Sequence, residues 1–578
     1  MNRIEIKNGY AHFECGCKFL VKEMGPPVRL IVKADTVNLP KDCKRTWDLL
    51  GEGNTKGIFQ LESNFGQQYA KKLKPQNMEQ LAALSAILRP GCKNAIRDGM
   101  SVSDHYIARK NGLEEVDFFH PDLEKILGST FGEMIYQEQA MQIAQHFAGF
   151  DLKQADVLRK AIGKKKADIM ASLKNDFIEG CRSVGLLSDE QSEELFSWIE
   201  KSQKYSFNKS HAVSYAESGY TTAYLKAHFP MSFFTSYLYY AKDKKPKPFD
   251  EVKLLVTNAK LMDISIYPPD FRNQFSHFKR VTSSIDKVYN PWNDKIYFGF
   301  GDIREVGESA ILKIKKALYP IELALEKPRS EWTWMDFLVF FSQEEGISST
   351  TINAMIEAGA LDYFRVSRTR MMFEYKHYSI LTKKEQAWIR QNLYSNYNKS
   401  FNKGIDDLSK LLSETIAAHE SGNKCFANKN RVVKAKGVLK LVQNPPSSLE
   451  DTPDWIARVE ESRLGTSLTS SIIAGCKGAD QANCTIIEFM KHKEKSSGIF
   501  IACQVESIKT HTTVNGDEMA FITITDGEVS LDSVCFSDSW QDIKASNLAF
   551  EGNMVMVSGD RSNRDDGGLI LKKMWQLS

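Results

Sequence analysis

The sequence has 578 residues, too many for one hydrophobic core, and about 150 residues per domain predicts roughly four domains. Its 76 lysines and arginines nearly balance 73 aspartates and glutamates, so the chain is not a bulk polycation and any surface for nucleic acid must come from local clustering. Ten scattered cysteines fit a reducing compartment better than a disulfide framework. The first residues lack the apolar core of a signal peptide and no run of 18 apolar residues occurs, so we expect a cytoplasmic protein without a membrane span.

The first half of the chain changes from strands to helices. Residues 1–50 predict short β-strands, among them residues 10–15 and 28–35. Residues 51–230 predict mainly helix, including a buried helix over the apolar run 81–88, which ends before a Pro-Gly pair.

A first basic stretch covers residues 158–166. Asp151 is a candidate N-cap of the helix that precedes it, and Arg159 and Lys160 fall in the last turn, where the helix dipole favours cations. Lys164 continues the group. Such a cluster could bind phosphates, although a solvated basic helix end has the same composition.

A second basic stretch, residues 205–215, mixes cations with aromatic rings. Tyr205 and Phe207 offer faces on which a base could stack, and Lys209 and His211 offer donors for phosphates. The alternative is a packed loop with incidental charge.

Two short patterns near the N-terminus raise the question of metals. Cys15 and Cys17, with His12, could bind an ion, but Cys-x-Cys without a second cysteine pair nearby lacks the spacing of a zinc ribbon, so the pattern favours ordinary cysteines. Lys33 and Asp35 lie two apart on a predicted strand and therefore point to one face. Together they could serve a triphosphate and its Mg²⁺, although a surface ion pair has the same spacing.

The second half begins with a new unit at residues 296–301. In the turn that follows, Val306 and Gly307 could present backbone N–H groups to a phosphate, at the start of a helix expected from about Ala310; an ordinary connection is the alternative. Residues 370–490 predict helices joined by polar connectors.

The last portion of the chain predicts strands at residues 498–505, 519–525, 531–536 and 553–559, with turn residues between them. About five such strands indicate a small barrel of the oligonucleotide-binding (OB) type.

Taken together, these stretches resemble the C-family replicative DNA polymerases, the bacterial DNA polymerase III alpha subunits. The likeness starts at Lys33 and keeps the family's order over most of the chain. The segments that carry it are residues 33–35, 57–63, 74–75, 88–91, 136–144, 155–166, 207–211, 268–270, 299–301, 306–308 and 464–469.

The resemblance assigns roles to residues. In that family a fingers domain binds the triphosphate of the incoming deoxynucleotide (dNTP) with basic residues, and a helix-hairpin-helix region contacts the DNA backbone. The implied nucleotide-binding residues are Arg159, Lys160, Lys164, Tyr205, Phe207, Asn208, Lys209, Ser210 and His211. The implied DNA-binding residues are Arg304, Val306, Gly307 and Gly359, with Glu305 in place of the first glycine of the hairpin.

The family's palm domain holds two Mg²⁺ ions with three carboxylates. By resemblance Lys33 and Asp35 are catalytic and Asp35 is a metal ligand. The other two carboxylates form Asp-x-Asp in the family, and no two aspartates in this sequence are two positions apart. One carboxylate cannot hold both ions, so we expect a separate palm-bearing polypeptide to supply the pair, as in split or phage-type replicases.

The expected fold is multidomain α+β, with a mainly helical fingers domain, a helix-hairpin-helix domain and a C-terminal OB-type barrel. The expected boundaries are 1–50 for a palm remnant and docking segment, 51–285 for the fingers, 286–375 for the helix-hairpin-helix domain, 376–490 for a helical connector and 491–578 for the barrel. Expected partners are primer-template DNA, dNTP, the palm-bearing polypeptide and, as a further candidate, a sliding clamp, with no membrane. The alternatives are a non-catalytic DNA-binding replication accessory and a structural assembly protein of a replisome.

Overall fold

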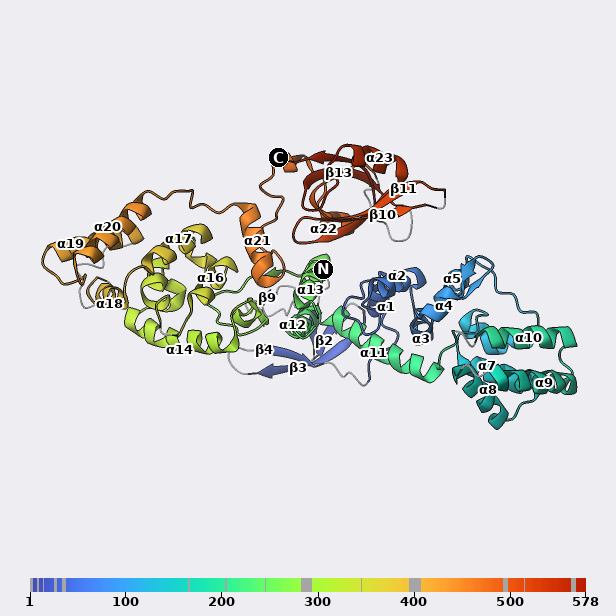
Figure 1. Ribbon diagram of the computed structural model, residues 1–578. Coiled ribbons are helices and arrows are strands. Elements are labelled where there is room, and N and C mark those ends of the chain that lie inside the picture. The colour runs from blue at the N-terminus through green and yellow to red at the C-terminus, as the bar shows by residue number, and fades with distance from the viewer. Residues whose placement is uncertain are drawn as a thin grey trace. The chain divides into compact units, whose positions relative to one another are not determined.

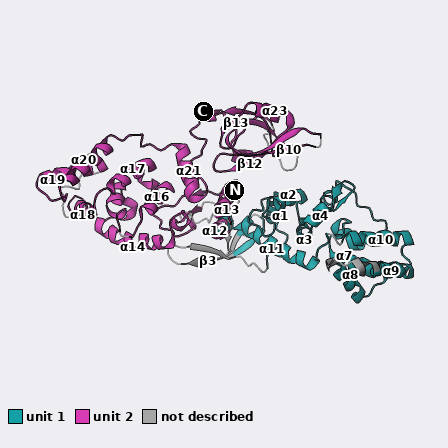
Figure 2. Cartoon of the chain, in the orientation of Figure 1, with its two compact units in different colours: residues 1–233, 284–290 teal, residues 234–283, 291–578 magenta. Residues whose placement is uncertain are grey.

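The computed structural model divides the chain into two compact units (Figure 2). The first comprises residues 1–233 with 284–290, and the second residues 234–283 with 291–578. The structure describes all residues except 1–3, 8–9, 14, 25–28, 34–37, 165–166, 203–204, 245, 282–293, 345, 394–406, 492–496, 514, 563–567 and 578. Among the helices it describes, none combines the length and the apolar character that crossing a bilayer requires.

The first unit opens with a four-stranded antiparallel sheet whose strands follow chain order. The strands are β1 (Ile4–Lys7), β2 (Tyr10–Phe13), β3 (Lys18–Met24) and β4 (Arg29–Lys33). A tight turn joins β2 to β3, in which the Phe13 N–H donates to the Cys17 carbonyl at 2.9 Å and Gly16 has a φ of +84°. Glycine adopts that backbone conformation at little cost. The strands predicted at residues 10–15 and 28–35 are confirmed as β2 and β4.

Helices form most of the rest of the first unit (Figure 1). They are α1 (Lys44–Gly51), α2 (Asn64–Leu73), α3 (Met78–Ile87), α4 (Pro90–Asn94), α5 (Val102–Lys110), α6 (Pro121–Leu127), α7 (Gln137–Ala148), α8 (Leu152–Lys164), α9 (Ala167–Val184), α10 (Asp189–Ser202) and α11 (Lys209–His228), with the short strands β5 (Ile96–Arg97) and β6 (Met100–Ser101) between α4 and α5. Two predictions are confirmed. The buried run 81–88 lies in α3, and Asp151 caps α8 by accepting a hydrogen bond from the Gln154 backbone nitrogen at 2.7 Å.

Helices α6 to α10 share one hydrophobic core. Phe147 of α7, Leu158 of α8, Phe177 of α9 and Phe196 of α10 are all 0–1% exposed within it. Because α7 and α8 bury residues in the same core, the basic end of α8 is held in a packed group with α7.

The second unit contains a short three-stranded sheet and a series of helices. The sheet runs in the order β7 (Ile266–Tyr267), β9 (Lys295–Tyr297), β8 (Lys279–Val281), with β7 and β9 parallel. The helices named here are α13 (Pro248–Leu261), α14 (Glu308–Leu325), α15 (Trp334–Asp336), α16 (Ser349–Glu357), α17 (Arg368–Tyr378), α18 (Lys383–Asn392), α19 (Leu408–Glu420), α20 (Lys429–Gln443), α21 (Pro453–Leu464) and α22 (Ile486–Lys491); α12 (Pro230–Ala241) spans the division between the units. The helix expected from about Ala310 begins at Glu308, because Gly307 is its N-cap.

The last five strands close into a barrel in the order β10-β11-β12-β14-β13. They are β10 (Ile499–Thr512), β11 (Glu518–Thr525), β12 (Ser530–Cys535), β13 (Met554–Arg561) and β14 (Leu569–Gln576), with α23 (Ser537–Ala545) after β12. Among the strand pairs described within the barrel, β12 and β14 are the one parallel pair. Alternate residues of β10, from Ile499 to Val505, point into the barrel core. This closed five-stranded form fits the predicted OB-type barrel.

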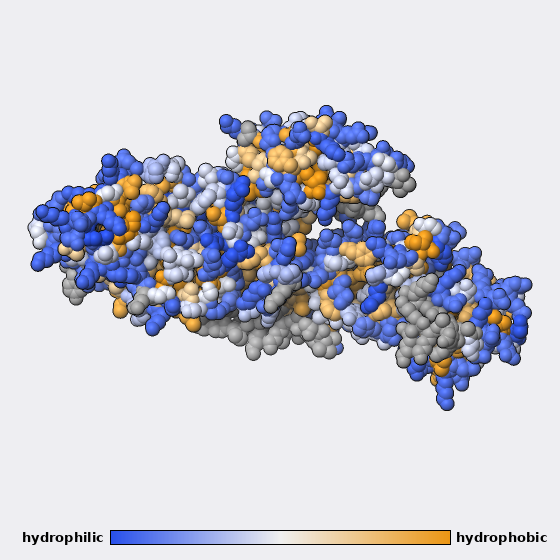
Figure 3. All heavy atoms as spheres, in the orientation of Figure 1, coloured by the Kyte–Doolittle hydropathy of each residue, from blue (hydrophilic) through white to orange (hydrophobic). Residues whose placement is uncertain are grey.

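The predicted multidomain α+β class is therefore confirmed, with a helical first unit and a closed barrel at the end of the second. On the face drawn in Figure 3, hydrophilic residues cover most of the surface and hydrophobic residues occur in small separate groups.

Candidate functional site

The start of helix α11 carries four of the predicted site residues. Asn208 is the N-cap, and its Oδ1 accepts hydrogen bonds from the His211 backbone nitrogen at 2.9 Å and from Ser210 Oγ at 2.6 Å. The side chains of Lys209, Ser210 and His211 are exposed. A helix N-terminus has partial positive charge, so Lys209 and His211 add their donors to a place that already attracts anions.

The N-terminal end of α7 holds this loop in place. The Phe207 backbone nitrogen donates to the Ile135 carbonyl at 2.8 Å, and the Gln137 nitrogen donates to the Phe207 carbonyl at 3.0 Å. The Glu138 carboxylate accepts from Asn208 Nδ2 and from the Lys209 backbone nitrogen, both at 2.9 Å. The orientation of the exposed residues at the start of α11 therefore depends on α7.

A row of aromatic side chains runs along the start of α11. The Arg89 guanidinium lies 3.7 Å from the centre of the Phe207 ring, which lies 5.4 Å from the His211 ring. The Tyr215 ring is 4.2 Å from His211 and stacks on Phe59 at 5.2 Å with an interplanar angle of 17°. Phe59 is 42% exposed, so the row ends at the surface. Flat faces of this kind can hold a nucleobase.

Tyr205, predicted to lie near a base, is buried within the first unit at 9% exposure. Burial raises the pKa of its hydroxyl above the usual range. Its backbone carbonyl accepts a hydrogen bond from the Cys92 thiol at 3.7 Å. In this structure Tyr205 supports the loop before α11 rather than presenting a free face to solvent.

The cations of α8 share one carboxylate. Arg159 Nη2 lies 2.8 Å and Arg159 Nε 3.0 Å from Asp156 Oδ1, and Lys160 Nζ lies 2.7 Å from Asp156 Oδ2. Hydrogen bonds from Lys160 and then Arg159 lower the pKa of Asp156. Lys164 is the last residue of α8, and its side chain lies outside the described residues.

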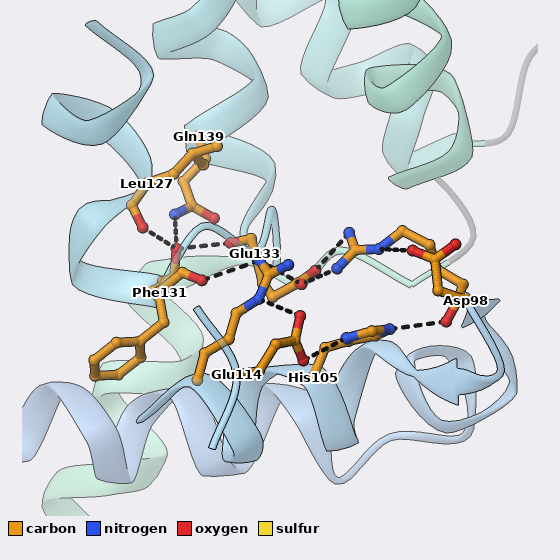
Figure 4. A network of polar contacts seen from close by, with 10 residues as sticks. Asp98, His105, Glu114, Leu127, Phe131, Glu133 and Gln139 are labelled. Carbon is orange, nitrogen blue, oxygen red and sulfur yellow. Dashed lines mark hydrogen bonds and ion pairs between the residues drawn. The ribbon is translucent and has the colours of Figure 1, made fainter. Parts of the chain in front are cut away.

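A network of buried polar side chains surrounds Glu133, shortly before the start of α7 (Figure 4). The Glu133 carboxylate is 0% exposed and pairs with Arg97 and with Arg109, whose Nη1 lies 3.1 Å from Glu133 Oε1. Glu114 bridges Arg109 Nε at 2.7 Å and His105 Nδ1 at 2.8 Å. Burial raises the pKa of Glu133 and the two guanidinium groups oppose that rise.

The same network reaches the first turn of α7. Gln139 Nε2 donates to Thr130 Oγ1 at 2.6 Å, and Thr130 Oγ1 contacts the Glu133 carbonyl at 2.6 Å. Gln139 Oε1 accepts from the Ile135 and Tyr136 backbone nitrogens at 3.0 and 2.9 Å. These bonds position the segment that pairs with Phe207.

The predicted catalytic pair lies at the edge of what the structure describes. Asp35 lies outside the described residues, and Lys33 is the last residue of β4 with its side chain outside them. Their roles stay predictions.

In the predicted DNA-binding turn of the second unit, one residue has open space around it. Gly307 caps α14, and a Cβ added there would meet no atom within 4 Å, whereas Val306 is 3% exposed. The Arg304 guanidinium lies over the Phe249 ring at 4.2 Å. Gly359 has a φ of +78°, and an added Cβ would lie 2.4 Å from Arg368 Nη2, so this glycine allows close packing.

The barrel displays a stacked aromatic pair on its surface. Phe500 and Trp575 lie 6.0 Å apart with an interplanar angle of 24°, and they are 37% and 41% exposed. Strand β13 pairs with both of their strands, β10 and β14.

Three residues of the site at α11 were given no role by the sequence: Phe59, Arg89 and Glu138. Each lies in a segment that carried the family resemblance, so the segments were identified but not their meeting point. Their contacts with residues 207–215 depend on tertiary structure, and the sequence separation of 70 between Glu138 and Asn208 gives no local signal.

Comparison with known proteins finds similarity to DNA polymerase III alpha subunits over most of the chain. The family model of the bacterial DNA polymerase III alpha subunit finger domain matches residues 28–185. The DNA polymerase III subunit alpha of Aquifex aeolicus is 30% identical over 542 residues, which are 94% of this chain and 39% of the relative. That of Pseudomonas aeruginosa is 31% identical over 92% of this chain and 42% of the relative, and that of Staphylococcus aureus strain MSSA476 is 28% identical over 92% and 42%. The chain thus spans about two fifths of the length of these curated relatives.

Proposed function

We propose that the chain is a C-family relative of the DNA polymerase III alpha subunits and that it supplies the nucleotide- and DNA-binding parts of a DNA-directed DNA polymerase. One observation carries the proposal. Phe59, Arg89 and Glu138 of the finger-domain match meet Phe207 and its neighbours at the exposed start of α11. A ring surface beside cations is what a nucleoside triphosphate requires.

The proposed roles follow from the chemistry of each side chain. Lys209 and His211, with Arg159, Lys160 and Lys164 of α8, would bind the triphosphate and stabilise the charge that develops on the transferring phosphoryl group. Asp156 pairs with Arg159 and Lys160 in this structure, so phosphate binding would exchange one anion for another. Asn208 and Ser210 would position that turn, and Phe207, with Tyr205 packed in the loop before it, would lie near the nascent base pair.

DNA contacts are assigned to the second unit. The turn of Arg304, Val306 and Gly307, with Gly359, would approach the duplex backbone, so that binding would be independent of sequence and sensitive to salt. The barrel would hold single-stranded template by stacking on residues such as Phe500 and Trp575. The domain boundaries predicted from the sequence, with fingers over residues 51–285, are part of this proposal.

The carboxylates for Mg²⁺ are incomplete within these residues. Asp35 would hold one ion, and no Asp-x-Asp occurs in the 578 residues, so they do not fit a two-metal site by themselves. When bound, Mg²⁺ would neutralise phosphate charge and favour attack by the primer hydroxyl. We propose that a separate palm-bearing polypeptide contributes the Asp pair, and that primer-template DNA, dNTP and a sliding clamp complete the assembly.

Primer extension with Mg²⁺ tests the proposal. Residues 1–578 are assayed alone and with a palm polypeptide that carries Asp-x-Asp, and the Asp35→Ala variant is assayed in the pair. We expect synthesis only in the pair and its loss in Asp35→Ala, with DNA binding unchanged.

Two outcomes would overturn parts of this proposal. Synthesis by residues 1–578 alone would refute the divided site. No synthesis with any Asp-x-Asp palm polypeptide, together with intact DNA binding, would support a non-catalytic replication accessory instead. The mass of the polypeptide in its native source decides whether the palm is a separate chain.

A further inference from the structure

Four side chains that can ligate a metal converge near the far end of α11. Cys15 and Cys17 lie in and after the turn between β2 and β3, Cys43 immediately precedes α1, and His228 is the last residue of α11. One ligand atom from each lies within 4.8 Å of the other three. Among the residues described, no other group of three or more His, Cys, Asp and Glu side chains meets this condition.

The distances suit one tetrahedral ion. Cys43 Sγ lies 3.3 Å and Cys15 Sγ 3.9 Å from His228 Nε2. With Zn–S bonds of about 2.3 Å and a Zn–N bond of about 2.0 Å, the corners of a tetrahedron lie roughly 3.5–3.8 Å apart. An ion could therefore enter with small movements of the side chains.

The local backbone brings these side chains together. Gly16, between the two cysteines, has the left-handed conformation that closes the turn, and an added Cβ would meet no atom within 4 Å. Cys43 is the N-cap of α1, yet its side chain makes no capping hydrogen bond. His228 is 1% exposed, and its Nδ1 has no hydrogen-bond partner among the described atoms, so Nε2 toward the sulfurs is its one polar contact with them.

Aromatic rings pack around His228, and Cys15 is the half-buried member of the cluster. The centres of Phe13, Phe19 and Tyr224 lie 5.0, 5.6 and 4.3 Å from the centre of His228. Cys17 and Cys43 are 7% and 3% exposed. An apolar shell of this kind excludes water and strengthens the bonds between an ion and its ligands. Four protein ligands are typical of a structural site, since a catalytic site keeps a position open.

We propose that Cys15, Cys17, Cys43 and His228 bind one Zn²⁺ ion in a structural Cys₃His site. Three thiolates with one imidazole select zinc among the common divalent ions. The sequence pattern had placed His12 beside the two cysteines; His12 is not in the cluster, and Cys43 and His228 take its place. The ion would tie the turn after β2 and the start of α1 to the last residue of α11.

The proposed zinc site would restrict the position of helix α11 as a whole. A helix of 20 residues is about 30 Å long, so the zinc would fix one end of α11 while Asn208 to His211 work at the other. The inference does not depend on the polymerase proposal, because metal content is measured on the chain alone.

The test is metal analysis of the full chain purified without metal-chelating resin. We expect about one zinc per chain by mass spectrometry, and on cobalt substitution the intense absorption of tetrahedral cobalt with thiolate ligands. Cys43→Ser and His228→Ala should lower the zinc content by about tenfold or more, whereas His228→Cys should keep it, because a Cys₄ site also binds zinc.

Cys92→Ser and Cys181→Ser are the matched controls, since both cysteines are buried in the first unit outside the cluster, and both variants should retain zinc. His228→Cys keeps the test valid if His228→Ala fails to fold. The proposal is overturned if the wild-type chain holds no zinc after growth with zinc, if Cys43→Ser holds as much as wild type, or if Cys15, Cys17 or Cys43 form a disulfide in protein purified under reducing conditions.

Discussion

The two ends of helix α11 differ in their exposure to solvent and in how tightly their side chains are packed. At the first turn Lys209, Ser210 and His211 are exposed, and hydrogen bonds to Asn208 and Glu138 hold their backbone and the Ser210 hydroxyl in place. Near the last turn Lys226 and His228 are 0% and 1% exposed. The difference indicates a division of work, in which the accessible end is available to a ligand and the buried end fixes the helix to the rest of the first unit.

Lys226 shows what the buried end requires. Its Nζ donates to the Asn54 carbonyl at 2.9 Å, to Asn54 Oδ1 at 3.1 Å and to the Lys56 carbonyl at 2.9 Å. Burial lowers the pKa of Lys226 well below its usual value. A polar group in that position is stable only because every donor finds an acceptor.

The largest expected effect is at the accessible end. Lys209→Ala removes an exposed ammonium but leaves the backbone N–H that donates to Glu138, so the fold should not change. If Lys209 contacts the triphosphate, kcat/KM for single-nucleotide insertion by the assembled polymerase should fall about 10²-fold. Rapid-quench measurement of insertion checks it.

Lys153→Ala is the control for Lys209→Ala, because Lys153 is an exposed lysine of the first unit to which no site role is assigned. It should leave kcat/KM unchanged. If Lys209→Ala costs no more than Lys153→Ala, the accessible end of α11 does not bind the nucleotide and the comparison between the two ends loses its functional meaning.

A smaller effect is expected from Lys226→Met at the buried end. The substitution removes the three hydrogen bonds that Lys226 donates to Asn54 and Lys56, which should lower the opening free energy of α11 by about 2 kcal/mol. Hydrogen exchange of peptides from α11 measures it. Lys153→Met, the same change at an exposed position, should have no measurable effect.

The contribution of Lys226 to stability also depends on pH, and the direction of that dependence follows from the pKa of Lys226. Because the pKa of Lys226 is lower in the folded chain than the unfolded value of about 10.4, the folded state binds fewer protons between the two values. The stability of wild type relative to Lys226→Met should therefore rise with pH across that window. A difference that is flat or falls with pH would contradict the buried state of this lysine.

The sequence predicted the parts of this molecule whose signals are local. The Asp151 cap and the strands of the barrel follow from residues within a few positions of one another. The prediction for Tyr205 assumed exposure, and burial depends on contacts that a loop sequence does not encode.

The buried end of α11 could not be predicted in the same way. Cys43 and His228 are 185 residues apart, and the pair Cys15 and Cys17 had no second cysteine pair nearby to complete a known spacing. The lone His12 was closer in sequence but lies outside the cluster. Convergence of distant single residues carries no periodic or spacing signal, which is why the chemistry of that end emerges only from the fold.

The smallest expected effect concerns the cations of α8, which belong with the accessible end. Asp156→Asn removes the charge that pairs with Arg159 and Lys160, so that a triphosphate would not compete with a carboxylate for these two cations. Because exposed ion pairs are weak, affinity for dNTP should rise only about threefold, measured by titration calorimetry of the full chain.

The double variant Asp156→Asn/Lys209→Ala tests whether the cations of α8 and the start of α11 bind the same triphosphate. If both sets of cations contact one triphosphate, Asp156→Asn should also raise the dNTP affinity of the Lys209→Ala variant, which binds more weakly than wild type. An unchanged or lower dNTP affinity in Asp156→Asn would mean that Asp156 orders α8 for binding and does not compete with the phosphates.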